Sequence, residues 1–257
     1  MKNMNFYFED FTLENYKRLL NLAQKKYSFI KYPMCKNDGK QILLRHDVDY
    51  SINGALALAK VEHELGISST YFIYPNSEGY NILEVQTVKT IREIIALGHE
   101  IGLHWDSGAY KELYPDISDV EAKLKKDIFS LEELFQCTID VISFHQPEAN
   151  GILDVSQEFF AEKINVYSDY FKKNYKYCSD SNGYWRFDRL EQLLTESKYE
   201  KMQILLHPIW WQQEVLSPAE RVWRYYLEQA KKKYICYCED MKACGRENIG
   251  EEKIDLE

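Results

Sequence analysis

The sequence predicts an α/β fold with a mainly parallel sheet, arranged either as a doubly wound sheet or as a βα barrel. From residue 41 onward, short apolar runs alternate with longer helical patterns, as they do when helices connect parallel strands. Of the 257 residues, 45% are hydrophobic and 14% are aromatic, which allows a large buried core. Charged residues of both signs make up 28% and are mixed along the chain, which argues against extended disorder.

The expected strands are short apolar runs, most of which end in a polar residue or in proline. They cover residues 41–49, 67–75, 99–106, 139–147, 175–180 and 202–208. The run at 67–75 is rich in β-branched and aromatic residues and stops at Pro75, which favours a strand. Parallel strands are covered on both faces, so nearly continuous apolar runs are the expected pattern.

The expected helices fill the intervals between these strands. They cover residues 52–66, 82–98 and 118–136, and a further amphipathic helix at 12–26 precedes the first strand. Gly66 and Gly98 supply the glycine that commonly ends a helix. A closing helix at 217–240 begins with Ser217 as its N-cap and Pro218 at its first helical position.

The charge and the N-terminus exclude several classes of function. A net charge of −9 disfavours a nucleic-acid partner, because phosphate binding requires a basic face. The N-terminal segment carries acidic residues from position 9 and has no stretch that resembles a secretion signal. No window approaches the length of uncharged apolar sequence that a membrane span needs. We therefore expect a soluble, cytoplasmic protein with no nucleic-acid partner.

Four of the expected strands end in histidine or aspartate. The polar residues at these ends are His46, Asp47, Asp49, His104, Asp106, His145 and His207. The carboxyl ends of parallel strands lie at one edge of the sheet, where βα folds place their chemistry. Burying charge there costs several kcal/mol unless the charge is paired or binds a metal, so a common site is a better interpretation than four separate core histidines.

Strand alternation separates these residues by face. Asp47 and Asp49 are two positions apart and point to one face, whereas His46 points to the other. Two carboxylates on one face repel each other, which favours a divalent cation or a shared proton between them. Of the remaining histidines, His99 belongs to the start of a strand and His63 to a helix surface, so neither is expected in the site.

Four sequence elements together resemble the polysaccharide deacetylase superfamily (carbohydrate esterase family 4, with its NodB-homology domain). In chain order they are "DVD" at 47–49, "GHEIGLHWD" at 98–106, "SFHQP" at 143–147 and "ILLHP" at 204–208. The resemblance covers about residues 40–210. It implies a single domain over 1–257, built on a distorted (β/α) barrel of about seven mainly parallel strands. Residues 1–39 would then form an N-terminal helical extension, and 217–240 a C-terminal helix.

The resemblance also implies roles for individual residues. In this family the first motif supplies a catalytic base followed by a metal ligand, which correspond here to Asp47 and Asp49. The second motif supplies a metal-binding histidine, which corresponds to His104. The last motif supplies the general acid, which corresponds to His207. The expected cofactor is one divalent metal ion, with zinc preferred.

The chain departs from the family pattern at two of these motifs. The second motif usually carries another histidine four residues after the first, but this position is Gly108. His145 or Asp106 could supply the third ligand, and we favour His145 because imidazole suits zinc-like ions. The third motif usually carries an arginine that steadies the catalytic aspartate. Arg45 or Arg186 could replace it, and the sequence does not choose between them.

Aromatic residues near the strand ends suggest a sugar-binding surface. Asp180 and Trp185 are the candidates for the Asp and Trp of the family's fourth motif, and Trp105 and Trp210 follow other strands. Indole rings stack on sugar rings, although buried tryptophans are also ordinary core residues. We expect these four residues to contact the substrate.

These observations predict a metal-dependent deacylase that hydrolyses an N-acyl group on a sugar, with surface polysaccharide biosynthesis as its expected context. Its expected partner is an acylated sugar or glycan precursor. One alternative is hydrolysis of another non-peptide C–N bond by the same site, as in a deformylase or an allantoinase-like enzyme. The other is a catalytically decayed carbohydrate-binding domain, for which Gly108 in place of the usual histidine is the best argument.

Overall fold

The computed structural model describes residues 6–34, 39–113, 120–146 and 156–250. Its strands are β1 (Ser28–Phe29), β2 (Gln41–Val48), β3 (Thr70–Ile73), β4 (Glu100–Trp105), β5 (Val141–Phe144), β6 (Phe159–Phe160), β7 (Lys163–Asn165), β8 (Lys176–Ser179) and β9 (Lys201–Leu206). Each strand expected from the sequence is present, with bounds shifted by a few residues. The short strands β1, β6 and β7 were not expected.

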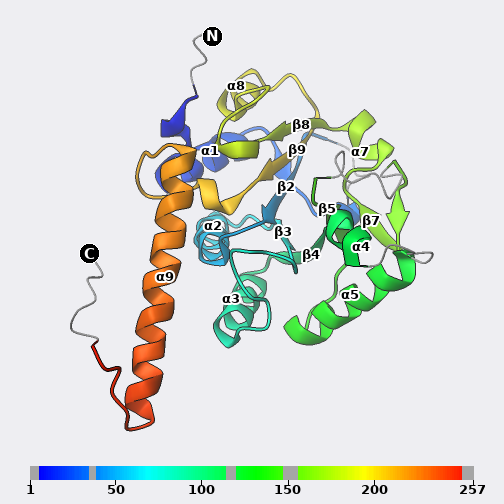
Figure 1. The fold of residues 1–257 in the computed structure, drawn as a ribbon. Helices are drawn as coiled ribbons and strands as arrows, with labels where there is room; N and C mark the ends of the chain where they lie inside the picture. The colour runs from blue at the N-terminus through cyan, green and yellow to red at the C-terminus, as the bar shows by residue number, and fades with distance from the viewer. Residues whose placement is uncertain (1–5, 35–38, 114–119, 147–155, 251–257) are drawn as a thin grey trace.

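The strands form one curled sheet in the order β6-β7-β5-β4-β3-β2-β9-β8, with β1 paired to the start of β2 (Figure 1). All neighbouring strands run parallel except the antiparallel pair β6–β7. Among the described residues the order ends at β6 and at β8, so the sheet is an open half-barrel. The prediction of a distorted, mainly parallel α/β barrel is confirmed.

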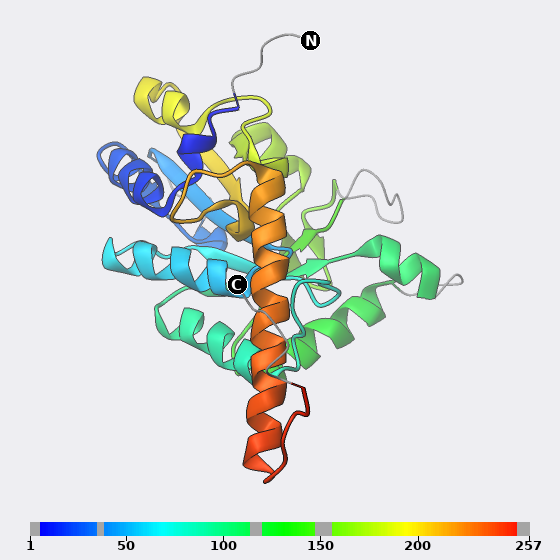
Figure 2. The same cartoon turned by 60° about the vertical axis from the view of Figure 1, so that its left-hand side comes forward.

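Helices pack outside this sheet (Figures 1 and 2). They are α1 (Leu13–Gln24), α2 (Ile52–Glu64), α3 (Val85–Ala96), α4 (Ser107–Leu113), α5 (Val120–Phe135), α7 (Asp169–Asn174), α8 (Leu190–Glu196) and α9 (Pro218–Ala243). Gly66 and Gly98 follow α2 and α3 with φ of 68° and 94°, the left-handed backbone that glycine adopts without strain. Ser217 and Glu220 form a complete capping box at the start of α9.

Strand β2 shows how the sheet divides its side chains. All eight of its residues are buried, as expected of a strand covered on both faces. Ile42 and Leu44 pack outward in the cluster that contains α1 and α8 residues, whereas Leu43 packs inside the half-barrel with Phe72. Even-numbered residues of β2 therefore face the surrounding helices, and odd-numbered residues face the interior.

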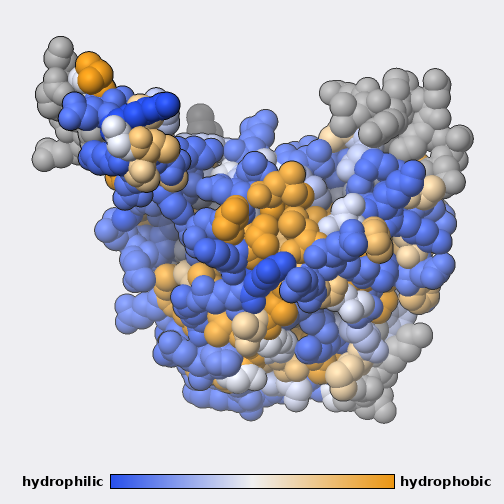
Figure 3. Space-filling view, turned by 90° about the horizontal axis from the view of Figure 1, so that it is seen from below, coloured by the Kyte–Doolittle hydropathy of each residue, from blue (hydrophilic) through white to orange (hydrophobic). Residues whose placement is uncertain are grey.

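Helix α9 is the longest element and stands partly clear of the body (Figures 1 and 2). Seen from below, its far end lies at the upper left, and most of the body's surface is hydrophilic, with one large apolar patch and several smaller ones (Figure 3). Within the described residues, no helix has both the length and the apolar character that crossing a membrane requires.

Candidate active site

Three side chains from three strand ends meet at the carboxyl edge of the sheet. Asp49 follows β2, His104 lies near the end of β4, and His145 follows β5. From Asp49 Oδ1, His104 Nε2 is 3.3 Å away and His145 Nδ1 is 3.6 Å away. The two imidazole nitrogens are 3.2 Å apart. One ligand atom from each residue lies within 4.8 Å of the others, so the three residues form a compact cluster of metal-ligand type.

Neighbouring side chains fix the orientation of the two imidazoles. Ser143, which is paired with His104 across β4 and β5, places its Oγ 2.5 Å from His104 Nδ1. That contact leaves Nε2 directed toward Asp49. The ring of Tyr74 stacks on His145 with centroids 4.6 Å apart, and its hydroxyl donates to Asp106 Oδ2 at 2.7 Å. Contacts of this kind commonly orient metal-binding histidines.

A second observation, the hydrogen bonding of Asp49, supports a divalent cation in this cluster. Asp49 Oδ1 is buried and has no hydrogen-bond partner among the described residues, although it faces two imidazoles. Buried carboxylate oxygens are rarely left without a partner unless an ion or a water occupies the space. A carboxylate with two imidazoles is also a donor set that zinc-like ions favour.

Asp47 lies beside this cluster and is held by Arg45. The Arg45 guanidinium is fully buried, and its Nη2 donates to Asp47 Oδ2 at 2.9 Å and to the Tyr167 hydroxyl at 2.8 Å. Asp47 Oδ2 also lies 3.7 Å from His104 Nδ1, while its Oδ1 has no hydrogen-bond partner among the described residues. Between the two arginines left open by the sequence, Arg45 contacts Asp47, whereas Arg186 is exposed at the surface.

His207 approaches the cluster from the other side and is paired with Asp180. Its Nδ1 lies 2.6 Å from Asp180 Oδ1, and its backbone N–H donates to both carboxylate oxygens at 3.0 Å. Trp211 Nε1 donates to the same carboxylate at 2.9 Å. The second imidazole nitrogen, Nε2, lies 3.8 Å from Asp49 Oδ2. Asp180 thus holds Nδ1 of His207, and Nε2 is directed toward the site.

The charges in this site shift the pKa values of its members. Burial lowers the pKa of His207, but the charge and hydrogen bond of Asp180 outweigh burial and raise it to about 9. Burial raises the pKa of Asp49, but the adjoining imidazoles of His104 and His145 outweigh it and hold that pKa well below its usual range. Burial likewise lowers the pKa of His145, and Asp49 reverses this and raises it. The site therefore combines an ionised Asp49 with a protonated His207 at neutral pH.

Several residues expected to contact substrate lie elsewhere. Trp105 is 1% exposed and its ring stacks on Tyr110 in the outer core, so this expectation is wrong. Its position next to His104 on a strand sends it to the opposite face. Asp180 is 0% exposed, so it contacts His207 instead of a substrate.

The other two tryptophans pack near the N-terminal segment. Trp185 donates its Nε1 to Asp10 at 2.7 Å and stacks on Phe11 with ring centroids 5.0 Å apart. One face of its ring and its N–H donor are thus used in packing, and its contact with substrate stays a prediction. Trp210 is half-buried against the same hydrophobic cluster, and its contact with substrate stays a prediction.

The alternative third ligand, Asp106, is committed to other contacts. Its Oδ1 accepts hydrogen bonds from the backbone N–H groups of Gly108 and Ala109 at 2.8 and 3.2 Å, at the start of α4. Its Oδ2 accepts the Tyr74 hydroxyl. His145, in contrast, points at Asp49, so the geometry favours His145 of the two candidates. Pro147, the last residue of the third motif, lies outside the described residues.

Ser143, Tyr74 and Arg45 complete the site, and the first two were not identified from the sequence. Each of the three lies two residues away from a residue that faces the interior: Ser143 from His145, Tyr74 from Phe72 and Arg45 from Asp47. Strand alternation was therefore a usable signal for all three. Applied to every strand end, it selects the inward-facing polar residues that surround a ligand.

His46 and His99 belong to a different, fully buried group on the outer face of the sheet. Both lie against Glu62 of α2, with His46 Nε2 2.6 Å from Oε1 and His99 Nδ1 3.3 Å from Oε2. The Tyr71 hydroxyl donates to Oε1 at 3.1 Å, and the Tyr16 hydroxyl donates to the same oxygen. As expected, His46 points away from Asp47, and His99 lies outside the site. We name this set the Glu62 cluster.

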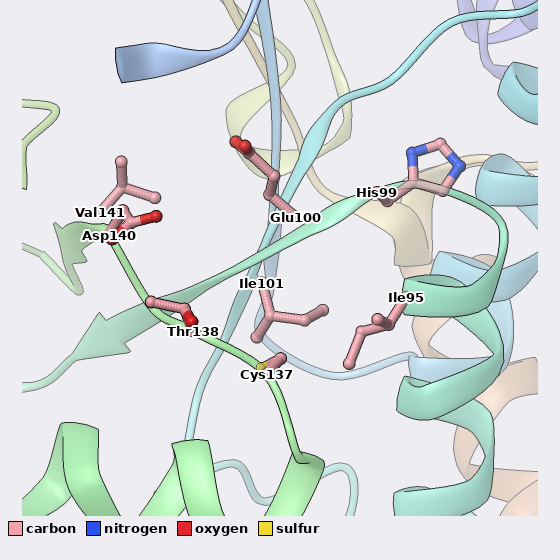
Figure 4. Close-up of a pocket in the computed structure, with 8 residues that line it drawn as sticks. All are labelled: Ile95, His99, Glu100, Ile101, Cys137, Thr138, Asp140 and Val141. Atoms are coloured by element: carbon pink, nitrogen blue, oxygen red, sulfur yellow. The ribbon is translucent and has the colours of Figure 1, made fainter.

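A separate cavity of about 130 Å³ lies where β4 and β5 begin, at the opposite end of the sheet (Figure 4). His99, Glu100 and Asp140 are among its lining residues. Figure 4 shows these side chains pointing in different directions, and His99 and Glu100 are paired with Glu62 and Lys31. Without convergent polar groups, this cavity is a poor candidate for chemistry.

Comparison with known proteins gives distant structural matches. No protein-family model matches the chain, and no curated protein matches it. IcaB from Ammonifex degensii matches with a TM-score of 0.39 and 16% identity, over 51% of this chain and 65% of that one. The Streptococcus pyogenes deacetylase PplD, in complex with acetate, matches with a TM-score of 0.42 and 11% identity, over 83% of this chain and 86% of that one.

A third match is BA3943 from Bacillus anthracis, described as a CE4 family pseudoenzyme. It has a TM-score of 0.40 and 10% identity, over 74% of this chain and 62% of that one. The chain thus spans slightly less than two thirds of the length of IcaB and of BA3943. Since these likenesses are distant, function is inferred from the geometry of the site itself.

Proposed function

We propose that this protein is a metal-dependent deacylase that removes an N-acyl group from a sugar. The observation that carries the proposal is the convergence of Asp47, Asp49, His104, His145 and His207 from four strand ends on one space. These residue types supply a base, a metal-ligand set and an acid, which are the groups that amide hydrolysis requires. A binding domain has no need of a paired base and acid on opposite sides of a metal-ligand set.

In the proposed site Asp49, His104 and His145 hold the ion. When bound, a zinc-like ion supplies Lewis-acid polarisation of the acyl carbonyl and of a water molecule. Ser143 holds His104 through Nδ1, so that its Nε2 is the ligand atom. Tyr74 holds the ring of His145 by stacking. The third ligand thus comes from the strand after the one that carries His104, in place of the histidine missing at Gly108.

Asp47 is the proposed general base. Arg45 hydrogen-bonds to its Oδ2, which leaves Oδ1 to accept a proton from the attacking water. The buried guanidinium also orients Asp47, because it is itself held by the Tyr167 hydroxyl and by the rings of Tyr167 and Phe72. General bases in this geometry commonly contribute about 10²- to 10⁴-fold to the rate.

His207 is the proposed general acid. Protonated by virtue of its raised pKa, it would donate its Nε2 proton to the departing amine, while Nδ1 stays hydrogen-bonded to Asp180. Asp180 acts through His207 only, since it is fully buried. A raised acid pKa matters because the leaving amine is a poor leaving group until it is protonated.

The substrate proposed is an acylated sugar or glycan precursor of surface polysaccharide synthesis. The deciding experiment measures acetate and formate release from a panel of N-acylated nucleotide-sugars and short glycans, with zinc content measured on the same preparation. Acetate release that depends on the metal supports the proposal. Release from non-sugar amides alone would support the alternative C–N hydrolase, and absence of both metal and release would support a decayed binding domain.

The choice of third ligand gives a direct test on metal affinity. Even partners that only orient ligands change metal affinity by about 10- to 100-fold, so replacing the ligand in His145→Ala should weaken zinc binding by more than about 100-fold. Asp106→Asn changes a carboxylate that is hydrogen-bonded to Tyr74 and to the start of α4, so its effect should not exceed the low end of that scale, about tenfold. Competition titration against a chelating dye measures both. Loss of zinc from Asp106→Asn with retention in His145→Ala would contradict the assignment.

The Asp180–His207 pair predicts the alkaline limit of activity. His207 must be protonated to act as an acid, so activity should persist through neutral pH and fall as pH rises through about 9. A cation held by Asp49 cancels that carboxylate's contribution, so the limit can lie somewhat lower. Asp180→Asn removes the main cause of the raised pKa and should move the limit toward the usual histidine value. A pH–rate profile unchanged by Asp180→Asn would rule out His207 as the acid.

A further inference from the structure

Helix α9 is anchored at one end only. Arg221 and Tyr225 are buried, with Arg221 Nη2 donating to Phe8 O at 3.0 Å and the Tyr225 hydroxyl contacting Tyr50 O and Gly79 O at 2.7 Å. Beyond these turns the helix extends away from the sheet and its covering helices (Figures 1 and 2). Isolated helices of a few turns are only marginally stable in water, so the projecting part gains from burying apolar surface against a partner.

The projecting part carries an apolar stripe with the spacing of a coiled coil. We name this stripe the α9 seam, and its residues are Leu227, Ala230, Tyr234, Tyr237 and Met241. Their spacings of three, four, three and four correspond to alternating a and d positions of a heptad. Tyr237 is 55% exposed and Leu227 is 40% exposed, and Trp223, one step earlier in the same pattern, is 71% exposed.

The seam lies on the side of α9 that faces away from the body. At 100° per residue, its positions fall roughly opposite to Arg221 and Tyr225, which face the body. The chain after the helix turns back along one flank, where Asn248 donates to the Cys238 Sγ at 3.2 Å and contacts the Tyr234 hydroxyl. The opposite flank, with Lys233 and Asp240, is exposed.

We propose that two copies of this chain dimerise through the α9 seam as an antiparallel helix pair. In this arrangement Tyr234 packs against Tyr237 of the partner subunit, and Ala230 packs against Met241 of the partner subunit. The two helices overlap over about 25 Å, and the bodies lie at opposite ends of the pair.

Charge selects the antiparallel arrangement. Lys233 and Asp240 occupy g positions, and in antiparallel coiled coils g positions face each other across the pair. Lys233 then meets Asp240 of the partner subunit, and the two-fold axis produces the same contact twice. In a parallel pair Lys233 would instead meet Cys238 of the partner subunit, which is uncharged and lies under the returning chain. The charges beside the α9 seam are therefore complementary in the antiparallel pair and not in the parallel pair.

Sedimentation equilibrium of the full chain tests this proposal. The wild-type protein should show a concentration-dependent monomer–dimer equilibrium. Tyr237→Asp places a charge in the seam and should weaken the dimer by at least about tenfold, because a desolvated, unpaired charge is costly. Since Tyr237 is largely exposed in one subunit, circular dichroism of this variant should match wild type. A wild-type monomer at every concentration, or a dimer unaffected by Tyr237→Asp, would overturn the proposal.

A charge exchange tests the direction of pairing. Lys233→Glu turns two attractive contacts into repulsive ones and should weaken the dimer by about tenfold, whereas combining it with Asp240→Lys should restore wild-type affinity. Lys232→Glu is the matched control. It makes the same change of charge on the side of the helix opposite the α9 seam and should have little effect on the dimer. Equal effects of Lys232→Glu and Lys233→Glu, or no recovery in the double variant, would overturn the antiparallel arrangement.

Discussion

Asp47→Asn is expected to reduce acyl release by about 10²- to 10⁴-fold while the protein keeps its metal. Asparagine has the shape of aspartate and can still accept the Arg45 hydrogen bond, but it cannot take a proton from water at neutral pH. The ligand set of Asp49, His104 and His145 is unchanged in this variant. Steady-state release assays, with zinc content measured on the same sample, separate loss of the base from loss of the ion.

The control for this prediction concerns Arg45. Its guanidinium is 0% exposed and forms its ion pair with Asp47, so neutralising the partner leaves a buried charge uncompensated and lowers stability. A thermal melt must therefore show that Asp47→Asn is folded at the assay temperature. Folded, zinc-loaded Asp47→Asn that turns over within tenfold of wild type would exclude Asp47 as the base.

Glu62→Gln is expected to lower the free energy of unfolding by about 3–5 kcal/mol, which is the scale for breaking a buried charge network. The Glu62 carboxylate is fully buried and accepts hydrogen bonds from Tyr16, Tyr71 and Ser69, with His46 at 2.6 Å. A glutamine amide would direct N–H groups at donors that need an acceptor. Urea denaturation of the wild type and the variant measures the difference.

Glu64→Gln on the same helix is the matched control. Its carboxylate is exposed and pairs with Lys17 at 2.8 Å at the surface, where ion pairs contribute little. The change in unfolding free energy should therefore be much smaller than for Glu62→Gln. Equal losses in the two variants would mean that the Glu62 cluster contributes no more than a surface ion pair.

The strand ends and the fold could be predicted because their signals are local. Burial of β2 on both faces requires an apolar run, and polar residues at its end stand out against it. Parallel connection then places Asp49, His104, His145 and His207 at one edge, which is why sequence order sufficed to bring them together. The choice of His145 over Asp106 also followed from ligand chemistry, and the geometry favours it.

The remaining features depend on contacts that no local pattern encodes. The strands β6 and β7 have two and three residues, too few for alternation to be recognised. The packing of Trp185 against the N-terminal segment could not be predicted, because its partner Asp10 lies 175 positions away in the sequence. Trp105 is different, because strand alternation from His104 is a local signal and places its side chain on the outer face. Asp180 is expected from the sequence to contact substrate, and its burial against His207 depends on the pairing of β8 with β9.

Strand β2 carries Arg45 and Asp47 on its inner face and His46, against Glu62, on its outer face, and this restricts how it can align with β3 and β9. A slip of one residue in one direction would bring Asp47 against Glu62, so that two buried carboxylates would face each other. A slip in the other direction would put Asp47 in the place of Val48, inside an apolar cluster. Either misalignment is strongly disfavoured, so the charges used for chemistry also reject the wrong registers during folding.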